Sequence, residues 1–212
     1  MFLLENYGLA VTFCVVTMIC WGSWANTTKL ADSTWRFELF YWDYPIGILF
    51  LSLVFAFTLG SIGDHGRSFL EDIQQADSSS FRSALIGGAV FNVSNILLTA
   101  AIATAGMSVA FPVGVGIALI LGVLDNYWKA PIGNPGVLFG GVGLIAFAII
   151  LNALAYRKLN SQSATVSSKG LILAVISGLL MGLFYGFVAS SMVKDFAHPE
   201  PGLLTPYTAV VF

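Results

Sequence analysis

The sequence predicts an all-α, polytopic membrane protein, and two observations carry this prediction. Of the 212 residues, 57% are hydrophobic and only 9% are charged, whereas a soluble domain has about 25% charged residues. The hydrophobic residues also gather in long runs, and a helix needs about 20 such residues to cross a bilayer. We therefore expect a chain of membrane-spanning helices whose first partner is lipid.

Six apolar runs predict six spans, and polar or Gly- and Pro-rich stretches separate them. The first run covers residues 8–26, and the second covers residues 40–60. In the polar loop that follows, residues 67–76 predict a short interfacial helix. Gly106 predicts a very tight turn, and KAPIGNP at 129–135 interrupts the chain again. The remaining expected spans are residues 84–105, 109–127, 136–156 and 170–192.

The last residues and a faint internal repeat predict a larger plan. A seventh span begins near Thr205, and the residues after it are too few to cross a bilayer. We therefore expect a fragment of a longer protein, and a tail that lies at the membrane interface is the alternative. A shift of 160 residues aligns Gly22 with Gly182 and Trp24 with Phe184. Five spans is an odd number, so a second copy would be inverted in the membrane, as in many transporters.

This plan divides the chain into three parts and predicts a ten-span parent. Residues 1–158 form the first five-span repeat, and residues 159–169 form a polar linker. Residues 170–212 begin the second, inverted repeat, which is truncated. Lys and Arg divide almost equally between the two sides, but Arg157 and Lys158 at a span end favour a cytoplasmic loop there. The N-terminus would then lie outside.

An aromatic and polar stretch at the end of the first span is a candidate part of a solute path. Trp21 and Trp24 lie on one helical face, and Asn26 and Lys29 lie on a neighbouring face. An indole ring can stack on a planar or sugar-like solute. The alternative is an interfacial belt, which Trp often supplies.

Three ionisable residues around the first turn are candidates for proton coupling or ion pairing. Asp43 is the best candidate for a carboxylate embedded in the membrane, and Glu38 lies just outside it. Partial desolvation raises the pKa of a carboxyl group, which suits a proton carrier. Lys29 is able to pair with either carboxylate, and an ion pair that anchors the turn is the alternative.

The third span carries a polar stripe. Asn92, Asn95 and Thr99 follow helical spacing, and a carboxamide that faced lipid would be costly. These side chains must therefore face protein or water. Hydrogen bonds between helices are one interpretation. Contact with a polar neutral solute is the other, because Asn both donates and accepts hydrogen bonds.

The fourth span contains Pro112, which removes a backbone donor and predicts a kinked or broken helix. Such a helix often borders the cavity of a transporter, although a kink for packing alone is also open. Small residues recur at every fourth position in two spans, which predicts close packing between helices. They are Ala110, Gly114, Ala118 and Gly122 in the fourth span, and Gly178, Gly182 and Gly186 in the sixth.

Several functional classes lack a sequence signal. We find no nucleophile, base or metal-binding constellation, so we expect neither an enzyme nor a cofactor or metal site. The net charge is −2 without a basic run, which argues against nucleic-acid binding. A drug exporter would carry a Glu within residues 8–26, and none is present. A secondary transporter of a small polar solute is the leading hypothesis, and a half-transporter that needs a partner chain is an alternative.

Several strings in this sequence are similar to a known family. CWGSWANTTKL, WRFELFYWDYPIGILF, FNVSNILLTAAIATAGMSVAFPVGVGIALILG and LTPYTA resemble bacterial relatives of the plant ureide permeases. That group belongs with the glucose/rhamnose-type carriers of the drug/metabolite transporter superfamily. The linker at 159–169 is much shorter than the long central loop of the plant proteins.

The resemblance carries its own expectations. It implies ten spans in two inverted repeats, and a location in the bacterial cytoplasmic membrane. It also implies proton-coupled uptake of allantoin or oxo-heterocycles such as uracil, while the related carriers take sugars. On this basis the missing spans or a second chain would be needed for activity.

Overall fold

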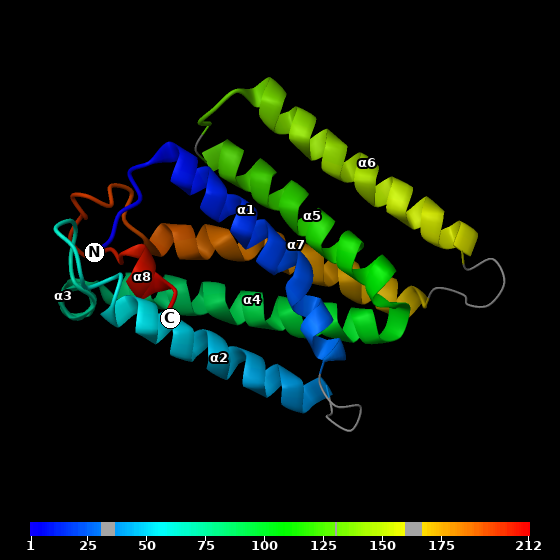
Figure 1. Ribbon diagram of the computed structural model, residues 1–212, viewed down its shortest axis with the longest axis horizontal. Coiled ribbons are helices and arrows are strands. Elements are labelled where there is room, and N and C mark those ends of the chain that lie inside the picture. The colour runs from blue at the N-terminus through cyan, green and yellow to red at the C-terminus, as the bar shows by residue number, and fades with distance from the viewer. Residues whose placement is uncertain (31–36, 130, 160–166) are drawn as a thin grey trace. The chain divides into compact units, whose positions relative to one another are not determined.

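The structure is a computed structural model that describes residues 1–30, 37–129, 131–159 and 167–212 (Figure 1). Within these ranges the chain is helical, with one isolated bridge between Met192 and Leu204. In chain order the elements are α1 (Tyr7–Ser23), the 3-10 helix η1 (Trp24–Lys29), α2 (Phe37–Phe57), α3 (Phe69–Gln75), α4 (Ser78–Ala105), α5 (Met107–Lys129), α6 (Pro135–Leu159), α7 (Ser168–Ser191) and α8 (Pro206–Ala209).

Five of the described helices are long and apolar enough to cross a membrane, namely α2, α4, α5, α6 and α7. This confirms the expected second to sixth spans and the all-helical fold class. The first expected span is divided, because α1 has 17 residues and η1 continues it for six more. Because α1 is shorter than the five membrane-length helices, the first expected span stays a prediction.

Local chemistry explains where several helices begin and turn. The Asn6 side chain accepts a hydrogen bond from the Leu9 N–H at 3.0 Å and caps α1. Ser68 and Glu71 form a capping box at the start of α3, which confirms the short helix expected in this loop. Gly106 has φ +83° and makes the turn between α4 and α5, as expected. Pro135 is the first residue of α6, where its missing N–H costs nothing.

Two expectations for the helices were wrong in detail. The third span was expected to begin at residue 84, but α4 begins at Ser78 because polar residues continue the helix beyond the apolar run. Of the kink or break expected at Pro112, the break does not occur, since α5 runs unbroken from Met107 to Lys129 with Pro112 inside it; a kink there stays a prediction. The missing proline N–H leaves the Ser108 carbonyl without its usual helical donor, and one lost bond does not end a helix that is packed on its neighbours.

The chain divides into two compact units, residues 1–81 with 192–212 and residues 82–191. The first unit contains α1, η1, α2, α3 and α8. The N-terminus is attached to this unit, because the Phe2 N–H donates to the Leu59 carbonyl at 2.7 Å. Met1 is 2% exposed. The expected start of a seventh span is the four-residue helix α8, which contacts α2 and α3.

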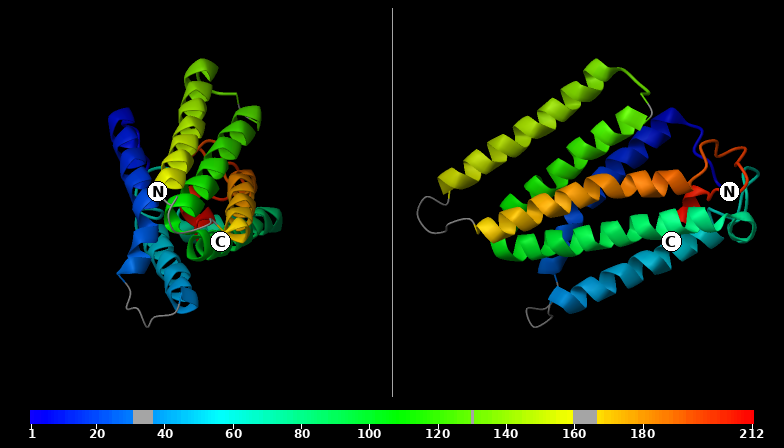
Figure 2. Two further views of the ribbon diagram at one scale, coloured as in Figure 1. Left: turned by 90° about the vertical axis from the view of Figure 1, so that its right-hand side faces the viewer. Right: turned by 180° about the vertical axis from the view of Figure 1, so that it is seen from behind.

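The second unit contains α4 from Arg82 onward, which packs on α5 and α7, and α6 lies alongside α5 (Figure 2). Ala101 of α4, Ala110 of α5 and Ala174 of α7 form its buried core. A Cβ added to Gly114 would lie 2.7 Å from the Leu98 side chain. These contacts set α4 antiparallel to α5 with Gly106 at the turn, which places Asn95 at the level of Ile117, near the middle of α5.

Small residues bring α5 and α7 together, as the sequence predicted. A Cβ on Gly178 would lie 2.6 Å from the Gly114 carbonyl oxygen, and one on Gly182 would lie 2.7 Å from the Leu121 side chain. The prediction holds only in part for α5, because a Cβ on Gly122 would have no neighbour within 4 Å. Backbones that approach this closely give van der Waals contact that larger side chains would prevent.

Candidate functional site

The polar centre of the second unit lies on α4, where Ser94 and Asn95 are both fully buried. The Ser94 hydroxyl donates to the Ser177 carbonyl at 2.8 Å, and the Ser177 hydroxyl donates to the Ser94 carbonyl at 2.8 Å. This reciprocal pair fixes α4 against α7 near the middle of both helices. It also uses the hydrogen-bonding capacity of the two serines within the protein.

Asn95 differs from these serines because its carboxamide has no partner. Its Nδ2 and Oδ1 atoms are both buried, and neither forms a hydrogen bond with any residue that the structure describes. Thr99, 7% exposed, donates to the Asn95 backbone carbonyl at 2.7 Å and not to the side chain. Leaving a buried polar group unpaired costs about 1–3 kcal/mol. The hydrogen bonding between helices that was one interpretation of Asn95 is therefore absent in the described structure.

The predicted stripe on α4 separates into two parts. Asn95 and Thr99 are buried, whereas Asn92 is exposed. The seam that packs on α5 and α7 runs through Ser94, Leu98 and Ala101, one residue away from the polar stripe. Helical spacing therefore placed the three polar residues on one face correctly, but it did not say how much of that face is covered.

The aromatic candidates belong to the first unit. The Trp24 ring stacks on the Tyr44 ring, with centroids 5.2 Å apart and planes inclined by 23°. The Trp24 Nε1 atom is buried, and the described residues offer it no hydrogen-bond acceptor. Trp21 is 38% exposed. The helix changes from α to 3-10 at Trp24, and residues three apart share a face in either kind of helix.

The polar and ionisable candidates near the first turn are not brought into one described site. Asn26 lies exposed on η1, and Asp43 lies exposed on α2. The side chains of Lys29 and Glu38 lie outside the described residues, so their predicted pairing with Asp43 stays a prediction. The described residues contain no group of three His, Cys, Asp or Glu side chains that could hold a metal ion.

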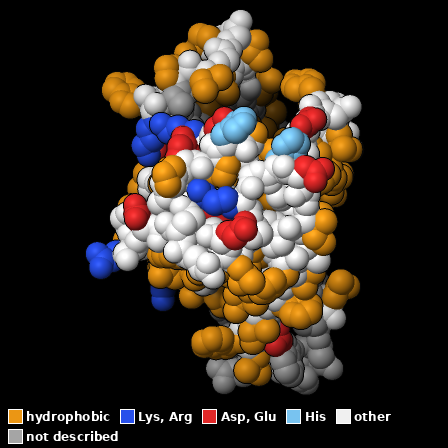
Figure 3. All heavy atoms as spheres, turned by 90° about the vertical axis from the view of Figure 1, so that its left-hand side faces the viewer, with side chains coloured by type: hydrophobic (Ala, Val, Ile, Leu, Met, Phe, Trp, Pro, Cys, Tyr) orange, Lys and Arg blue, Asp and Glu red, His pale blue; other side chains and the backbone are white. Residues whose placement is uncertain are grey.

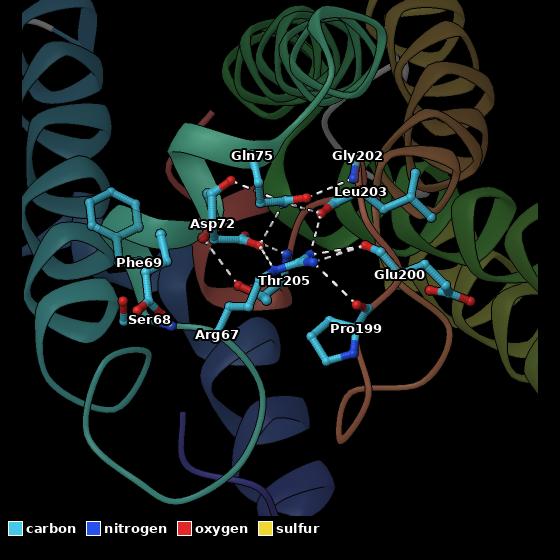
Figure 4. A network of polar contacts seen from close by, with 12 residues as sticks. Arg67, Ser68, Phe69, Asp72, Gln75, Pro199, Glu200, Gly202, Leu203 and Thr205 are labelled. Carbon is cyan, nitrogen blue, oxygen red and sulfur yellow. Dashed lines mark hydrogen bonds and ion pairs between the residues drawn. The ribbon is translucent and has the colours of Figure 1, made fainter.

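A polar network that sequence reasoning missed joins two loops of the first unit (Figure 4). We call it the Arg67 clasp; it consists of Arg67, Asp72, Gln75 and the backbone of residues 199–205. The Arg67 Nε–H donates to the fully buried Asp72 carboxylate at 2.9 Å. The guanidinium also donates to the carbonyls of Pro199, Glu200 and Leu203, at 2.8 to 3.2 Å. One cation thereby holds the loop that precedes α8.

The remaining polar atoms of the clasp are also paired. The second Asp72 oxygen accepts from the Thr205 N–H at 2.7 Å. Gln75 accepts from the Gly202 N–H at 2.7 Å and donates to the Leu203 carbonyl at 3.0 Å. Figure 3 views the end of the molecule that carries these loops, and charged side chains of both signs are mixed there with hydrophobic ones. Such a fully satisfied network holds one loop conformation.

Sequence signals for the clasp are local and incomplete. The spacing of Ser68 and Glu71 is a recognisable capping box, and it marks the start of α3. Apart from Asp72, the partners of Arg67 lie more than 130 residues away in the chain, and they are backbone carbonyls that carry no sequence signature. Only the folded structure reveals this contact.

Comparison with known proteins supplies a family. The sequence model of the ureide permease family matches residues 40–174. The chain is 26% identical to ureide permease 1 of Arabidopsis thaliana over 167 residues, 78% of this chain and 43% of that protein. It is 28% identical to ureide permease 2 of the same plant over 162 residues, 74% and 41% of the two chains.

A third relative comes from another plant. The probable ureide permease A3 of Vigna unguiculata is 29% identical over 169 residues, 77% of this chain and 44% of that protein. No solved structure matches the chain. The chain spans less than half the length of these relatives. All three are named permeases, which are transporters and not enzymes, so the expectation of a non-enzyme is confirmed. The described residues contain five membrane-length helices, and together with the permease family they make the chain an integral membrane protein.

Proposed function

The chain belongs to the ureide permease family, and we propose that it forms part of a secondary transporter for a small polar solute. The proposed solutes are ureides and related nucleobase-like heterocycles, with sugars as the alternative. The names of the relatives support the ureide class. The membrane-length helices supply the setting that a transporter requires.

The observation that carries this proposal is the Asn95 side chain. It lies level with the middle of α5, and its carboxamide is buried with both polar atoms unpaired among the described residues. Transporters bind their solutes near the middle of the bilayer. A polar group kept there without a protein partner is costly, and binding of a polar solute would offset that cost during each transport cycle.

The larger architecture belongs to the same proposal. Ten spans in two inverted repeats would place the described helices in the first repeat and the start of the second. Further spans or a second chain would complete the path, and a half-transporter is the corresponding alternative. The three relatives come from plants, so a bacterial cytoplasmic membrane and the drug/metabolite transporter superfamily stay predictions.

The other candidates receive roles that direct experiments would test. Trp21, Trp24 and Asn26 would line the entrance of the path, and Asn92, Thr99 and Pro112 would border it further along. Asp43 would carry the coupling proton, with Lys29 and Glu38 as its partners. Asp43→Asn should then abolish accumulation driven by a proton gradient while leaving exchange of solute intact. Unchanged accumulation would return Asp43 to an ion-pair role.

Uptake measurements test the proposed function. The complete reading frame that contains this chain is expressed in cells, and the uptake of labelled allantoin, uracil and rhamnose is measured with and without a proton gradient. We expect uptake of at least one of the first two solutes, and a decrease when the gradient is removed. Uptake of none of the three, together with efflux of drugs, would contradict the proposal.

A further inference from the structure

We propose that Asn95 recognises the solute through a pair of hydrogen bonds to a cis-amide edge, that is, an N–H and a C=O on adjacent ring atoms. This inference rests on the proposed transport function and deepens it by naming the chemical group that is recognised. The same edge occurs in cyclic ureides, imides and oxo-pyrimidines, and it is absent from sugars. The inference therefore favours the heterocyclic solutes over the sugars.

The chemistry of the Asn95 carboxamide matches a cis-amide. An Asn side chain places one acceptor oxygen and one donor N–H next to each other in a plane. A cis-amide presents the complementary pair, so the two groups are able to form two parallel hydrogen bonds. Asn pairs with the adjacent donor and acceptor of adenine in the same two-point manner. Both Asn95 atoms needed for this geometry are unpaired within the described structure.

A second observation is that no other buried polar side chain that the structure describes in the second unit is left unpaired beside Asn95. The other buried polar side chains of the second unit are bonded within the protein. Ser94 and Ser177 bond each other, Thr99 bonds the Asn95 backbone, and Ser191 bonds the Val188 carbonyl at 2.7 Å. The core beside them is lined with alanine and leucine. A sugar would bring several hydroxyls to this surface without enough partners, whereas a flat heterocycle needs one polar edge and buries apolar faces.

The position of Asn95 on α4 also suits recognition of a solute. Asn95 precedes Leu98 by one helical turn, and Leu98 meets Gly114 where α4 crosses α5. Asn95 also follows Ser94, which fixes α4 to α7. The carboxamide is therefore carried by a stretch of α4 that both neighbouring helices hold in place. A recognition group on a rigid element is oriented before the solute arrives, which reduces the entropy that binding must overcome.

The test uses the complete protein reconstituted in lipid vesicles, with labelled uracil as the transported probe. Unlabelled uracil, 1,3-dimethyluracil and rhamnose are added as competitors. Dimethylation keeps both carbonyls but removes both N–H donors. We expect dimethyluracil to compete about 10- to 100-fold less well than uracil, the loss that follows when a buried polar group loses its partner. Rhamnose should compete no better than dimethyluracil.

Two variants separate recognition from folding. Asn95→Leu should reduce uracil uptake at least tenfold and should raise the midpoint temperature of unfolding, because it replaces an unpaired buried amide with an apolar side chain of similar size. The matched control is Asn152→Leu on the exposed surface of α6, which should leave uracil uptake unchanged.

The outcomes separate the role of Asn95 from the transport function. Normal uracil uptake by Asn95→Leu, or equal competition by uracil and dimethyluracil, would overturn the role of Asn95 while the transport function stands. A lower unfolding midpoint in Asn95→Leu would identify a structural amide and would also overturn the inference. Failure of the unaltered protein to transport any of the solutes would overturn the proposed function and the inference with it.

Discussion

Replacement of Arg67 by methionine should destabilise the first unit, because it leaves a buried carboxylate without its cation. The Asp72 side chain is 0% exposed and the Arg67 side chain is 19% exposed. In Arg67→Met, Asp72 would keep only the hydrogen bonds from the Thr205 N–H at 2.7 Å and the Gln75 amide at 3.2 Å. The loop that precedes α8 would also lose its contacts with the guanidinium.

The magnitude follows from this burial. Removal of one partner from a buried ion pair costs about 3–5 kcal/mol. Two donors still face the Asp72 carboxylate, so we expect the lower end of this range, about 3 kcal/mol in the free energy of unfolding. The matched control is Arg82→Met, because Arg82 is exposed on α4. A substitution of this kind usually changes stability by less than about 0.5 kcal/mol.

The assay is denaturant-induced unfolding of the protein in detergent micelles, followed by Trp fluorescence. A second substitution, Asp72→Asn, removes the charge that Arg67 balances. The double variant should therefore lose less stability than the sum of the two single variants, since the neutral amide no longer needs a cation. If Arg67→Met unfolds at the same denaturant concentration as Arg82→Met, the clasp does not hold the loop and the reasoning is refuted.

Three further predictions concern turns, helix packing and a titrating side chain. Gly202 has φ +84°, and an added Cβ would lie 2.5 Å from a carboxylate oxygen of Asp77. Gly202→Ala should therefore lower the free energy of unfolding by at least about 1 kcal/mol. Gly143 has nothing within 4 Å of an added Cβ, so Gly143→Ala should stabilise α6 by about 0.5–1 kcal/mol. Equal unfolding midpoints for these two variants would contradict the turn assignment. Gly178→Val should separate α5 from α7 and lower the unfolding midpoint, whereas Gly122→Val, which meets no neighbour within 4 Å, should have a small effect; the reverse order would contradict the packing seam. Hydrogen bonds from Ser68 lower the pKa of Glu71 below its ordinary value of 4.5, so its contribution to α3 is present above that value and is lost as the pH falls through the lowered pKa; a carboxylate titration by NMR that gives a pKa of 4.5 or more would contradict the capping box.

Hydrophobic runs were sufficient to predict where the long helices lie, because a helix that crosses a bilayer needs an apolar stretch as long as the bilayer core is thick. The ends were less predictable. Ser78 begins α4 six residues before the apolar run, since hydrogen bonding in the backbone continues without apolar side chains. Pro112 did not break α5, since a proline within a helix removes one backbone hydrogen bond and the rest of the helix continues.

The candidate site was predictable in residue type but not in detail. Spacing on one helix placed Asn92, Asn95 and Thr99 in one stripe, and burial by other helices then singled out Asn95 as the unpaired amide. That burial depends on contacts between distant segments, which a single sequence does not reveal. The Arg67 clasp was missed for the same reason, since most acceptors of the Arg67 guanidinium are backbone carbonyls of a distant loop.

Counterflow in lipid vesicles tests the central claim most directly, because it requires a carrier but no coupling ion and no knowledge of transport direction. Vesicles that contain the complete protein are loaded with unlabelled uracil and diluted into a trace of labelled uracil. The proposed transporter predicts a transient accumulation of label inside the vesicles above its external concentration. Label that enters no faster than it enters protein-free vesicles would contradict the claim that this chain belongs to a carrier of small polar solutes.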